Sequence, residues 1–355
     1  MKIQRLLIFP VKSLLPVEVT YAEVTSEGFR FDRQYVLVKV PPDPSTRLAE
    51  HVTVKKTYGL ALFQPSIDDQ WSKLTIRHTQ SRSGGGGGGG GNGGSEEDSS
   101  SSSSSSSSIT IPLTPSPFHC TSAATYIVSI FGTTATGVDM GDEVASFFSG
   151  HLDLPVRLLF IGGDGRRRIP GAAYTASSTK PLPSLVHQFR GDAQFQAIRF
   201  ADAAPYLVTS SASEKEALSR LPLDQQGFDI LARLRPNIHI DVGDEVPPFD
   251  EDEWHELTVY TDGSRTRQKA LIRCIFKCAR CLSLNADLNN GETAKRENQL
   301  YGLLARDRRV NHIFPHKPVF GQYSYITPVG GTLQVGDEVA VTKRNAQENE
   351  TMVGV

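Results

Sequence analysis

Three of the four cysteines in this 355-residue chain stand close together, as Cys274, Cys278 and Cys281. The spacing C-x3-C-x2-C holds iron–sulfur clusters in radical-SAM enzymes, where the motif opens a long α/β barrel. Only 74 residues (355 − 281) follow the last cysteine, and Arg280 stands where that motif usually has an aromatic residue. A structural zinc site would need a fourth ligand such as His312 or His316, and neither has a tight paired spacing with another cysteine. The sequence therefore favours Cys274 and Cys278 as small buried residues on a strand.

Cys281 differs from the other two because it follows Arg280 at a point where the strand is expected to end. Nearby cations favour a thiolate, which is a soft ligand for a thiophilic metal. From Arg265 to Lys317 there are 12 Lys/Arg and 4 Asp/Glu residues, so the surrounding segment is cationic. Such a segment suits an anionic small ligand, and a solvated basic face is the alternative. Another basic run, Arg166–Arg168, follows a Gly-rich turn and is interpreted as a solvated loop rather than a phosphate site.

Composition excludes several classes of protein. The net charge of −2 and the pI of about 6.5 argue against a generic nucleic-acid binder. Four cysteines are too few for a secreted disulfide scaffold of this length. The N-terminal apolar run is too short for a signal peptide, and no stretch of 18 unbroken apolar residues follows, so we expect a soluble, cytoplasmic protein with no membrane span.

Short alternating apolar runs predict a β-rich α+β fold rather than a doubly wound parallel sheet, because helices do not alternate regularly with strands. Strands are expected at Ile3–Phe9, Val17–Val24, Tyr35–Val40, Val156–Phe160, Asn237–Val242, Glu256–Tyr260, Ala270–Phe276 and, as a short pair, from Gly330 onward. Helices are expected at Asp142–Leu152, Thr209–Leu221 and Lys295–Ala305. The Gly and Ser runs of residues 81–108 predict a disordered loop inserted in a hairpin between Leu74–His78 and Ile109–Pro112.

The run RCIFKCARCLSLNADLNNG (Arg273–Gly291) resembles the signature of MOSC domains, above all that of the mitochondrial amidoxime-reducing components and of the C-terminal part of molybdenum cofactor sulfurase. Further likeness is spread over most of the chain. FPVKSLLPVEV (Phe9–Val19) and GFRFDRQYVLV (Gly28–Val38) resemble the N-terminal barrel region of that family. FADAAPYLVTSSAS (Phe200–Ser213), RLRPNIHI (Arg233–Ile240), EDEW (Glu251–Trp254) and FGQY (Phe320–Tyr323) resemble the MOSC core.

The resemblance implies a MOSC-type β-barrel core and a division into three parts. Residues 1–130 would form the N-terminal MOSC-associated β region, 131–199 a connecting helix and strand region, and 200–345 the MOSC domain. It also implies a molybdenum–molybdopterin cofactor whose metal is ligated by Cys281, the catalytic residue. The expected cofactor-binding residues are Lys12, Ser13, Arg33, Ser210, Arg235, Asn237, Arg280 and Tyr323.

Several of these residues have a structural alternative. Lys12 and Arg33 could be ordinary surface cations, Arg235 could pair with the acidic run near Asp250, and Ser210 could serve only as a helix cap.

The implied activity is reduction of N-hydroxylated compounds such as amidoximes and hydroxylamines. Electrons would come from a cytochrome b5-type protein and its flavin reductase. The alternative is a non-catalytic module that carries the cofactor and works with a separate pyridoxal-phosphate desulfurase, a cofactor sulfurase. Relatives on the mitochondrial outer membrane have an N-terminal anchor, whereas this sequence starts directly at the first expected strand, so mitochondrial association is the secondary expectation.

Overall fold

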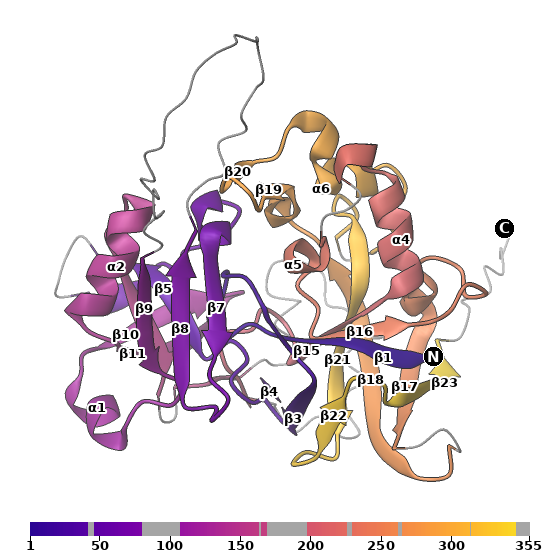
Figure 1. Cartoon of the computed structure of the whole chain (residues 1–355), viewed down its shortest axis with the longest axis horizontal. Helices are drawn as coiled ribbons and strands as arrows, with labels where there is room; N and C mark the ends of the chain where they lie inside the picture. Colours follow the sequence, from indigo (N-terminus) through magenta and orange to yellow (C-terminus); the bar gives the residue numbers. More distant parts are fainter. Residues whose placement is uncertain are drawn as a thin grey trace, which may run out of the picture.

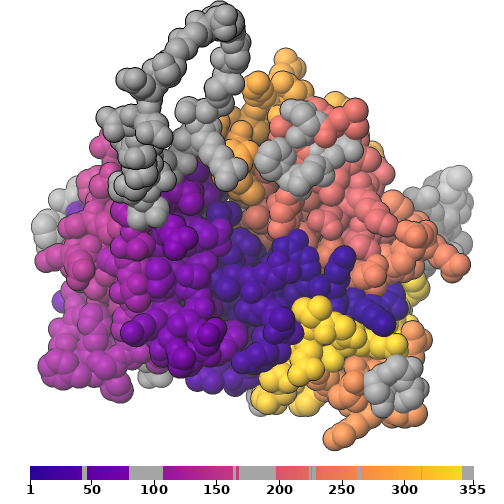
Figure 2. Space-filling view, in the orientation of Figure 1, coloured from indigo at the N-terminus to yellow at the C-terminus, as the bar shows by residue number. Residues whose placement is uncertain are grey.

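The computed structural model describes residues 1–41, 46–79, 107–162, 165–168, 197–225, 229–261, 265–312 and 314–345. The chain forms two lobes that lie side by side (Figure 1 and Figure 2). One lobe, in indigo to magenta, holds most of the first 160 residues. The other, in orange to yellow, holds the C-terminal half together with the first strand, which crosses to it from the N-terminus (Figure 1).

The C-terminal lobe is a closed barrel of seven strands. Its strand order is β16–β15–β21–β18–β17–β23–β1, and the pairing of β1 with β16 closes the barrel. The strands are β1 (Lys2–Ile8), β15 (Tyr206–Ser210), β16 (Ile238–Asp241), β17 (Trp254–Tyr260), β18 (Gln268–Ala279), β21 (Val319–Thr327) and β23 (Glu338–Arg344). A short strand, β2 (Val17–Val19), extends the sheet beyond β1.

Alternating burial explains why these segments form a barrel. Along β18 the side chains of Ala270, Ile272 and Cys274 are buried while Arg273 is exposed, so one face of the strand enters the core. Irregularities interrupt the β18–β21 register between Cys274 and Phe276 and again before Ala279. Bulges of this kind bend a strand and redirect its side chains, and here they precede the turn that contains Cys281.

The N-terminal lobe contains two sheets. One has the order β5–β12–β11–β10–β6 and the other β7–β8–β9. Their strands are β5 (Tyr35–Lys39), β6 (Leu48–Ala49), β7 (Phe63–Ile67), β8 (Lys73–His78), β9 (Ser108–Pro112), β10 (Thr125–Ile130), β11 (Thr133–Asp139) and β12 (Val156–Ile161). The helices of this lobe are η1 (Tyr58–Leu62), α1 (Pro117–Ser122) and α2 (Asp142–Leu152).

The hairpin expected around the Gly/Ser run is confirmed, because β8 pairs antiparallel with β9 from Lys73–Pro112 to Arg77–Ser108. The disorder predicted for residues 81–108 falls on positions outside the described residues as far as 106, whereas Ser107 and Ser108 are described and Ser108 belongs to β9.

Short helices cover one side of the barrel. They are α4 (Ser211–Ser219), η2 (Leu223–Gln225), α5 (Leu231–Leu234), η3 (Asp250–Glu253), η4 (Leu282–Asn285), η5 (Arg296–Asn298) and α6 (Leu300–Leu304). Leu231, Leu234, Leu284, Leu300 and Leu304 pack with Leu7 and Phe9 of the first strand region in a second apolar cluster. The remaining strands are β3 (Tyr21–Thr25), β4 (Gly28–Phe29), β13 (Arg167–Arg168), β14 (Ala197–Ile198), β19 (Ala286–Asp287), β20 (Glu292–Thr293) and β22 (Thr332–Gln334).

The β-rich class, the barrel core and the helix Asp142–Leu152 agree with the sequence predictions. Two predicted elements are divided in the structure. The helix expected at Lys295–Ala305 is broken into η5 and α6, because Gln299 is extended between them. The strand expected at Val17–Val24 is two strands, since β2 pairs with β1 whereas β3 pairs with β4 and β22. Two short strands follow Gly330, as expected: β22 joins β3, whereas β23 joins the barrel.

The helix expected at Thr209–Leu221 starts two residues later, since Thr209 and Ser210 belong to β15. Within the described ranges, no helix has the length and apolar character needed to span a bilayer.

Candidate functional site

Cys281 lies at the end of the longest barrel strand. It follows β18 and Arg280 and caps η4, with an extended backbone. Its thiol is exposed, and its Sγ lies 3.0 Å from Ser283 Oγ. Cys274 and Cys278 are buried, which confirms the prediction for those two residues. Among the residues that the structure describes, no group of three or more His, Cys, Asp or Glu side chains is placed to hold a metal ion.

Arg280 is buried beside this thiol. Its guanidinium donates hydrogen bonds to Leu234 O (2.6 Å) and to Cys278 Sγ (3.1 Å). Burial disfavours the charge of Arg280, but the neighbouring groups Cys278, Tyr323 and Cys281 raise its pKa. Nε of Arg280 and two nitrogens of Arg233 have no hydrogen-bond partner among the described residues. Buried donors left in this way are suited to an anionic ligand that completes their hydrogen bonds.

Arg33 and Arg235 both pack against the ring of Phe9. Their guanidinium carbons are 4.6 and 4.2 Å from the centre of its ring. Arg33 also donates to Asp32 Oδ2 (2.5 Å) and to the backbone oxygen of Arg235 (3.2 Å). Arg235 donates to Leu14 O (2.7 Å) rather than pairing with the acidic run near Asp250. Burial and the charge of Arg33 lower the pKa of Arg235 to about 9. Two cations are thus held close together by an aromatic face and by backbone carbonyls.

Asn237 forms a hydrogen bond with Arg33 and holds it in place. Its Oδ1 accepts hydrogen bonds from Arg33 Nη1 (3.1 Å) and Leu207 N (3.3 Å), and its Nδ2 donates to Leu7 O (3.1 Å). These bonds occupy the amide group at both ends. Asn237 therefore positions the arginine in this structure.

Lys12 is buried rather than a surface cation, and it forms an ion pair with Asp202. Burial lowers the pKa of Lys12. Burial also disfavours ionisation of Asp202, but Lys12, Arg33 and Arg167 together lower the pKa of this carboxyl. Lys12, Arg33, Arg235 and Arg280 therefore share one electrostatic environment in which Asp32 and Asp202 provide part of the countercharge.

Three of the predicted ligand-binding positions have a strained backbone. Ser13, Arg33 and Arg235 have φ values of +76°, +47° and +61°, in the left-handed region that residues other than glycine seldom adopt. Non-glycine residues in this conformation cost of order 1–3 kcal/mol each and are concentrated at functional sites. Six other described non-glycine residues have a positive φ as well, so the strain is a shared property of these three predicted positions rather than proof of one site.

Tyr323, on β21, faces the same end of the barrel. Its ring lies 4.9 Å from that of Phe276, between ring centres. The hydroxyl of Ser13, which follows Lys12, donates to Val52 O (3.2 Å). Electrostatic interactions link Lys12 with Arg33, Arg33 with Arg235, and Arg235 with Arg280. Arg280 in turn interacts with Cys281 and Tyr323, while Asn237 accepts from Arg33 and Ser13 follows Lys12 in the chain. These predicted site residues therefore lie in one region.

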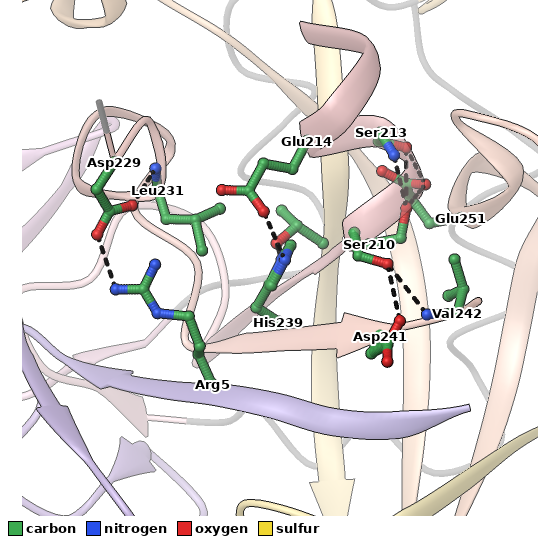
Figure 3. Close-up of polar contacts among 12 residues, drawn as sticks. Arg5, Ser210, Ser213, Glu214, Asp229, Leu231, His239, Asp241, Val242 and Glu251 are labelled. Atoms are coloured by element: carbon green, nitrogen blue, oxygen red, sulfur yellow. Dashed lines mark hydrogen bonds and ion pairs between the residues drawn. The ribbon is translucent and has the colours of Figure 1, made fainter. Parts of the chain in front are cut away.

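Ser210 is placed differently from the other predicted residues. It is fully buried and caps α4, since its Oγ accepts from Ser213 N (3.3 Å) and donates to Glu251 Oε2 (2.8 Å). Figure 3 shows Ser210 and Ser213 turned toward Glu251. Ser210 lies three residues along β15 from Leu207, which contacts Asn237, and three residues of strand span about 10 Å. As a helix cap it fits the structural alternative, and a direct ligand role stays a prediction.

Sequence reasoning missed two polar residues of the site. Asp202 lies within the FADAAPY run but was not singled out. Arg167 was expected in a solvated loop, and this was wrong: its side chain is 1% exposed and donates to Ala201 O (2.6 Å) and Asp202 O (2.8 Å). Its bonds to Ala201 and Asp202 hold the segment that presents the Asp202 carboxylate to Lys12. No local signal marks Arg167, because its partners lie more than 30 positions away.

Comparison with known proteins gives two domain matches. The MOSC N-terminal beta barrel domain matches residues 1–85 and the MOSC domain matches residues 196–340. All nine predicted site residues fall within these two stretches.

Three relatives illustrate the range of similarity. "Mitochondrial amidoxime-reducing component 1" of Homo sapiens is 24% identical over 345 residues, covering 95% of this chain and 82% of the relative. "Mitochondrial amidoxime reducing component 2" of Macaca fascicularis is 28% identical over 213 residues, covering 59% and 54%. "Molybdenum cofactor sulfurase" of Drosophila willistoni is 27% identical over 258 residues, covering 73% of this chain and 25% of the relative.

Proposed function

Because this chain is a MOSC-domain protein with a MOSC N-terminal barrel domain and is homologous to the amidoxime-reducing components, we propose that it is a molybdenum-dependent reductase of N-hydroxylated compounds. The role shared by its two kinds of relative is a molybdenum-cofactor-related one. The observation that carries the finer proposal is the exposed Cys281 thiol beside a buried arginine with an unused donor, in a region of closely spaced cations.

The donor set fits a molybdenum–molybdopterin cofactor. A thiolate from Cys281 would hold the metal, as a soft ligand does. Lys12, Arg33, Arg235 and Arg280 would neutralise the phosphate and orient the pterin, with Ser13, Ser210, Asn237 and Tyr323 as further predicted contacts. When bound, the cofactor supplies the two-electron redox chemistry.

The chain's own residues would provide the remaining requirements of the reaction. Breaking the N–O bond of an amidoxime takes two electrons and two protons and yields the amine-type product and water. Buried cations around the site would hold the anionic cofactor with little reorganisation. Asn237 and Phe9 would keep Arg33 and Arg235 in place during turnover. We further propose that a cytochrome b5-type protein and its flavin reductase supply the electrons.

The test uses protein from a host that makes the cofactor, with Cys281→Ala beside the wild type. Cys120→Ala, at a half-buried cysteine of α1, is the matched control. We expect about one molybdenum and one pterin per chain in the wild type and the control, and reduction of benzamidoxime with a supplied electron donor. The Cys281→Ala protein should keep its fold and lose the activity. Full activity in metal-loaded Cys281→Ala protein would contradict the proposal.

The second candidate function is that of a cofactor carrier working with a separate cofactor sulfurase. It is favoured by one observation, the match of 73% of this chain to a molybdenum cofactor sulfurase. A loaded protein that transfers cofactor to an apoenzyme but never reduces an N-hydroxylated substrate would select this function over the reductase.

The cytoplasmic location stays a prediction from the sequence. The names of the relatives favour mitochondrial association as the alternative. Fractionation of cells that produce the tagged chain distinguishes the two locations.

A further inference from the structure

The backbone places His51 beside two of the predicted site residues. β5 pairs with β12 along one edge and with two other segments along the opposite edge. Lys12 N and Val52 N each donate a hydrogen bond to a carbonyl of β5 on that edge, at 2.7 and 2.8 Å. The hydroxyl of Ser13 donates to Val52 O (3.2 Å), so the two segments are also joined to each other. His51, the residue before Val52, is therefore held next to the segment that carries Lys12 and Ser13.

Charged groups of the site act on the imidazole of His51. Burial and the positive charge of Lys12 lower the pKa of His51 to about 4. Arg167 acts in the same direction and Asp202 in the opposite one. The ring therefore lies within reach of the Lys12–Asp202 ion pair, and it is neutral at physiological pH.

Hydrogen bonding decides which ring nitrogen of the neutral histidine carries the proton. Nδ1 of His51 lies 3.1 Å from the backbone oxygen of Ser129, on β10. A carbonyl oxygen can only accept, so Nδ1 carries the hydrogen and Nε2 keeps its lone pair. Nε2 has no hydrogen-bond partner among the residues that the structure describes, and it is not one of the buried unpartnered nitrogens. His51 thus presents an accessible, neutral acceptor.

Acceptors without a partner are scarce in this part of the site. The side chains of Lys12, Arg33 and Arg167 can only donate. The carboxylate of Asp32 is engaged by Arg33, and that of Asp202 by Lys12. The Asp202 side chain is 44% exposed, so this end of the ion pair is open to a small molecule from solvent. A ligand with an O–H or N–H group that enters here finds Nε2 of His51 as a partner.

We propose that Nε2 of His51 accepts a hydrogen bond from the N-hydroxylated substrate and thereby selects compounds with an O–H or N–H donor over N-oxides. The inference rests on the proposed reductase function, whose substrate it describes further. Amidoximes and hydroxylamines have such donors, whereas the oxygen of a tertiary N-oxide can only accept. The bond from Nδ1 to Ser129 O fixes the ring, so the acceptor is in place before the substrate binds. A fixed acceptor discriminates against a ligand without a donor, because the acceptor would lose its partner in the complex.

The test measures binding to oxidised protein from a cofactor-producing host, with no electron donor, so that no ligand is reduced. The probes are benzamidoxime, which has both donors, and pyridine N-oxide, which has neither. His51→Leu removes the acceptor, and His51→Gln keeps an amide oxygen that can accept. His119→Leu is the matched control, since His119 is also half-buried and its Nε2 bonds to Asp139 O (2.8 Å).

We expect His51→Leu to bind benzamidoxime about tenfold more weakly than the wild type, because one hydrogen bond is lost. His51→Gln should bind it within about threefold of the wild type, and the control should bind like the wild type. The affinity for pyridine N-oxide should be the same in all four proteins. A general loss of structure in His51→Leu would instead weaken the binding of both probes.

Nitrogen-15 NMR of labelled histidines gives a second readout that does not depend on any variant. In the free protein, the His51 signals should show a protonated Nδ1 and an unprotonated Nε2. Benzamidoxime should shift the Nε2 signal of His51 as that nitrogen accepts a hydrogen bond. The signals of His119 should stay in place, and pyridine N-oxide should shift the His51 signal much less.

Several results would overturn the proposal. These are no binding of benzamidoxime by the wild type, equal benzamidoxime affinities in the wild type and His51→Leu, or a proton on Nε2 in the free protein. Loss of pterin from His51→Leu, with unchanged benzamidoxime affinity in the chains that keep it, would make His51 a cofactor contact instead. Failure of the reductase function looks different: benzamidoxime would bind through His51 but would not be reduced with any electron donor.

Discussion

Replacing Glu251 by Gln should change how the stability of the protein depends on pH. Glu251, on η3, is fully buried, and its Oε2 accepts hydrogen bonds from Ser210 (2.8 Å) and Ser213 (2.6 Å). Its Oε1 has no hydrogen-bond partner among the described residues. Burial raises the pKa of this carboxyl to about 7 from an ordinary value of 4.5.

The sign of the effect follows from proton binding. Between pH 4.5 and 7 the folded protein keeps the proton on Glu251 while the unfolded chain has released it, so stability falls as pH rises through this interval. Above pH 7 the loss is complete and amounts to about 3 kcal/mol. Gln cannot ionise, and its amide oxygen can still accept from both serines, so the variant should lack this loss.

The measurement is the free energy of unfolding from urea denaturation at pH 5 and at pH 8.5. From pH 5 to 8.5 the wild type should lose about 2.5 kcal/mol more than Glu251→Gln, because part of the loss already occurs below pH 5. Glu253→Gln, at a half-exposed carboxylate of the same short helix, is the control and should follow the wild type. Parallel pH profiles for the wild type and Glu251→Gln would refute the argument that a buried carboxyl is protonated beneath α4.

Two further substitutions test the geometry of the site. Asn237→Ala should lower the free energy of unfolding by about 2–3 kcal/mol, because it leaves Leu7 O and Leu207 N without their buried partner. Asn237→Asp should not restore the stability, since a carboxylate cannot donate a hydrogen bond to Leu7 O. A loss below about 0.5 kcal/mol in urea denaturation would contradict this role. Gly321→Ala should lower the free energy of unfolding by about 1–3 kcal/mol, because φ of Gly321 is +77° and the new Cβ would lie 2.7 Å from Val208 O. A thermal midpoint equal to that of the wild type would contradict this and show that β21 can move away from β15.

Local patterns were enough to predict much of the fold. The helix Asp142–Leu152 was found with its observed bounds, since acidic residues fill its first turn and Val144, Ala145 and Phe148 mark its buried face. The hairpin on either side of the Gly/Ser run was found because both strands alternate in polarity. In each case the signal lies within about a dozen residues.

The features that could not be predicted depend on contacts between residues far apart in the sequence. A helical pattern runs through Lys295–Ala305. In the structure, however, the side chain of Asn285 accepts a hydrogen bond from Tyr301 N, and Gln299 is extended between the two short helices. The placement of Arg33 and Arg235 against Phe9 joins three separate segments. Residue types and motif likeness could nominate these arginines, but their shared contact with Phe9 depends on how distant segments pack together.

The same reasoning applies to Ser210. A serine ahead of a helical pattern predicts a cap, and the structure has that cap. The buried Glu251, which accepts a hydrogen bond from the Ser210 hydroxyl, lies 41 positions away, so no local pattern connects the two residues.

The position of β1 has a consequence for how the protein is made. This strand is near the start of the chain, yet it lies between β23 and β16 and closes a barrel whose other strands begin at Tyr206. During synthesis, β1 leaves the ribosome more than 300 residues before β23, with which it pairs through Lys2 and Glu338. Its apolar side chains, such as Ile3 and Leu6, therefore remain without their barrel partners until the whole N-terminal lobe has been synthesised. Closure of the barrel is therefore a late event that ties the beginning of the chain to its end, and a fragment of the C-terminal half would expose two unpaired strand edges prone to aggregation.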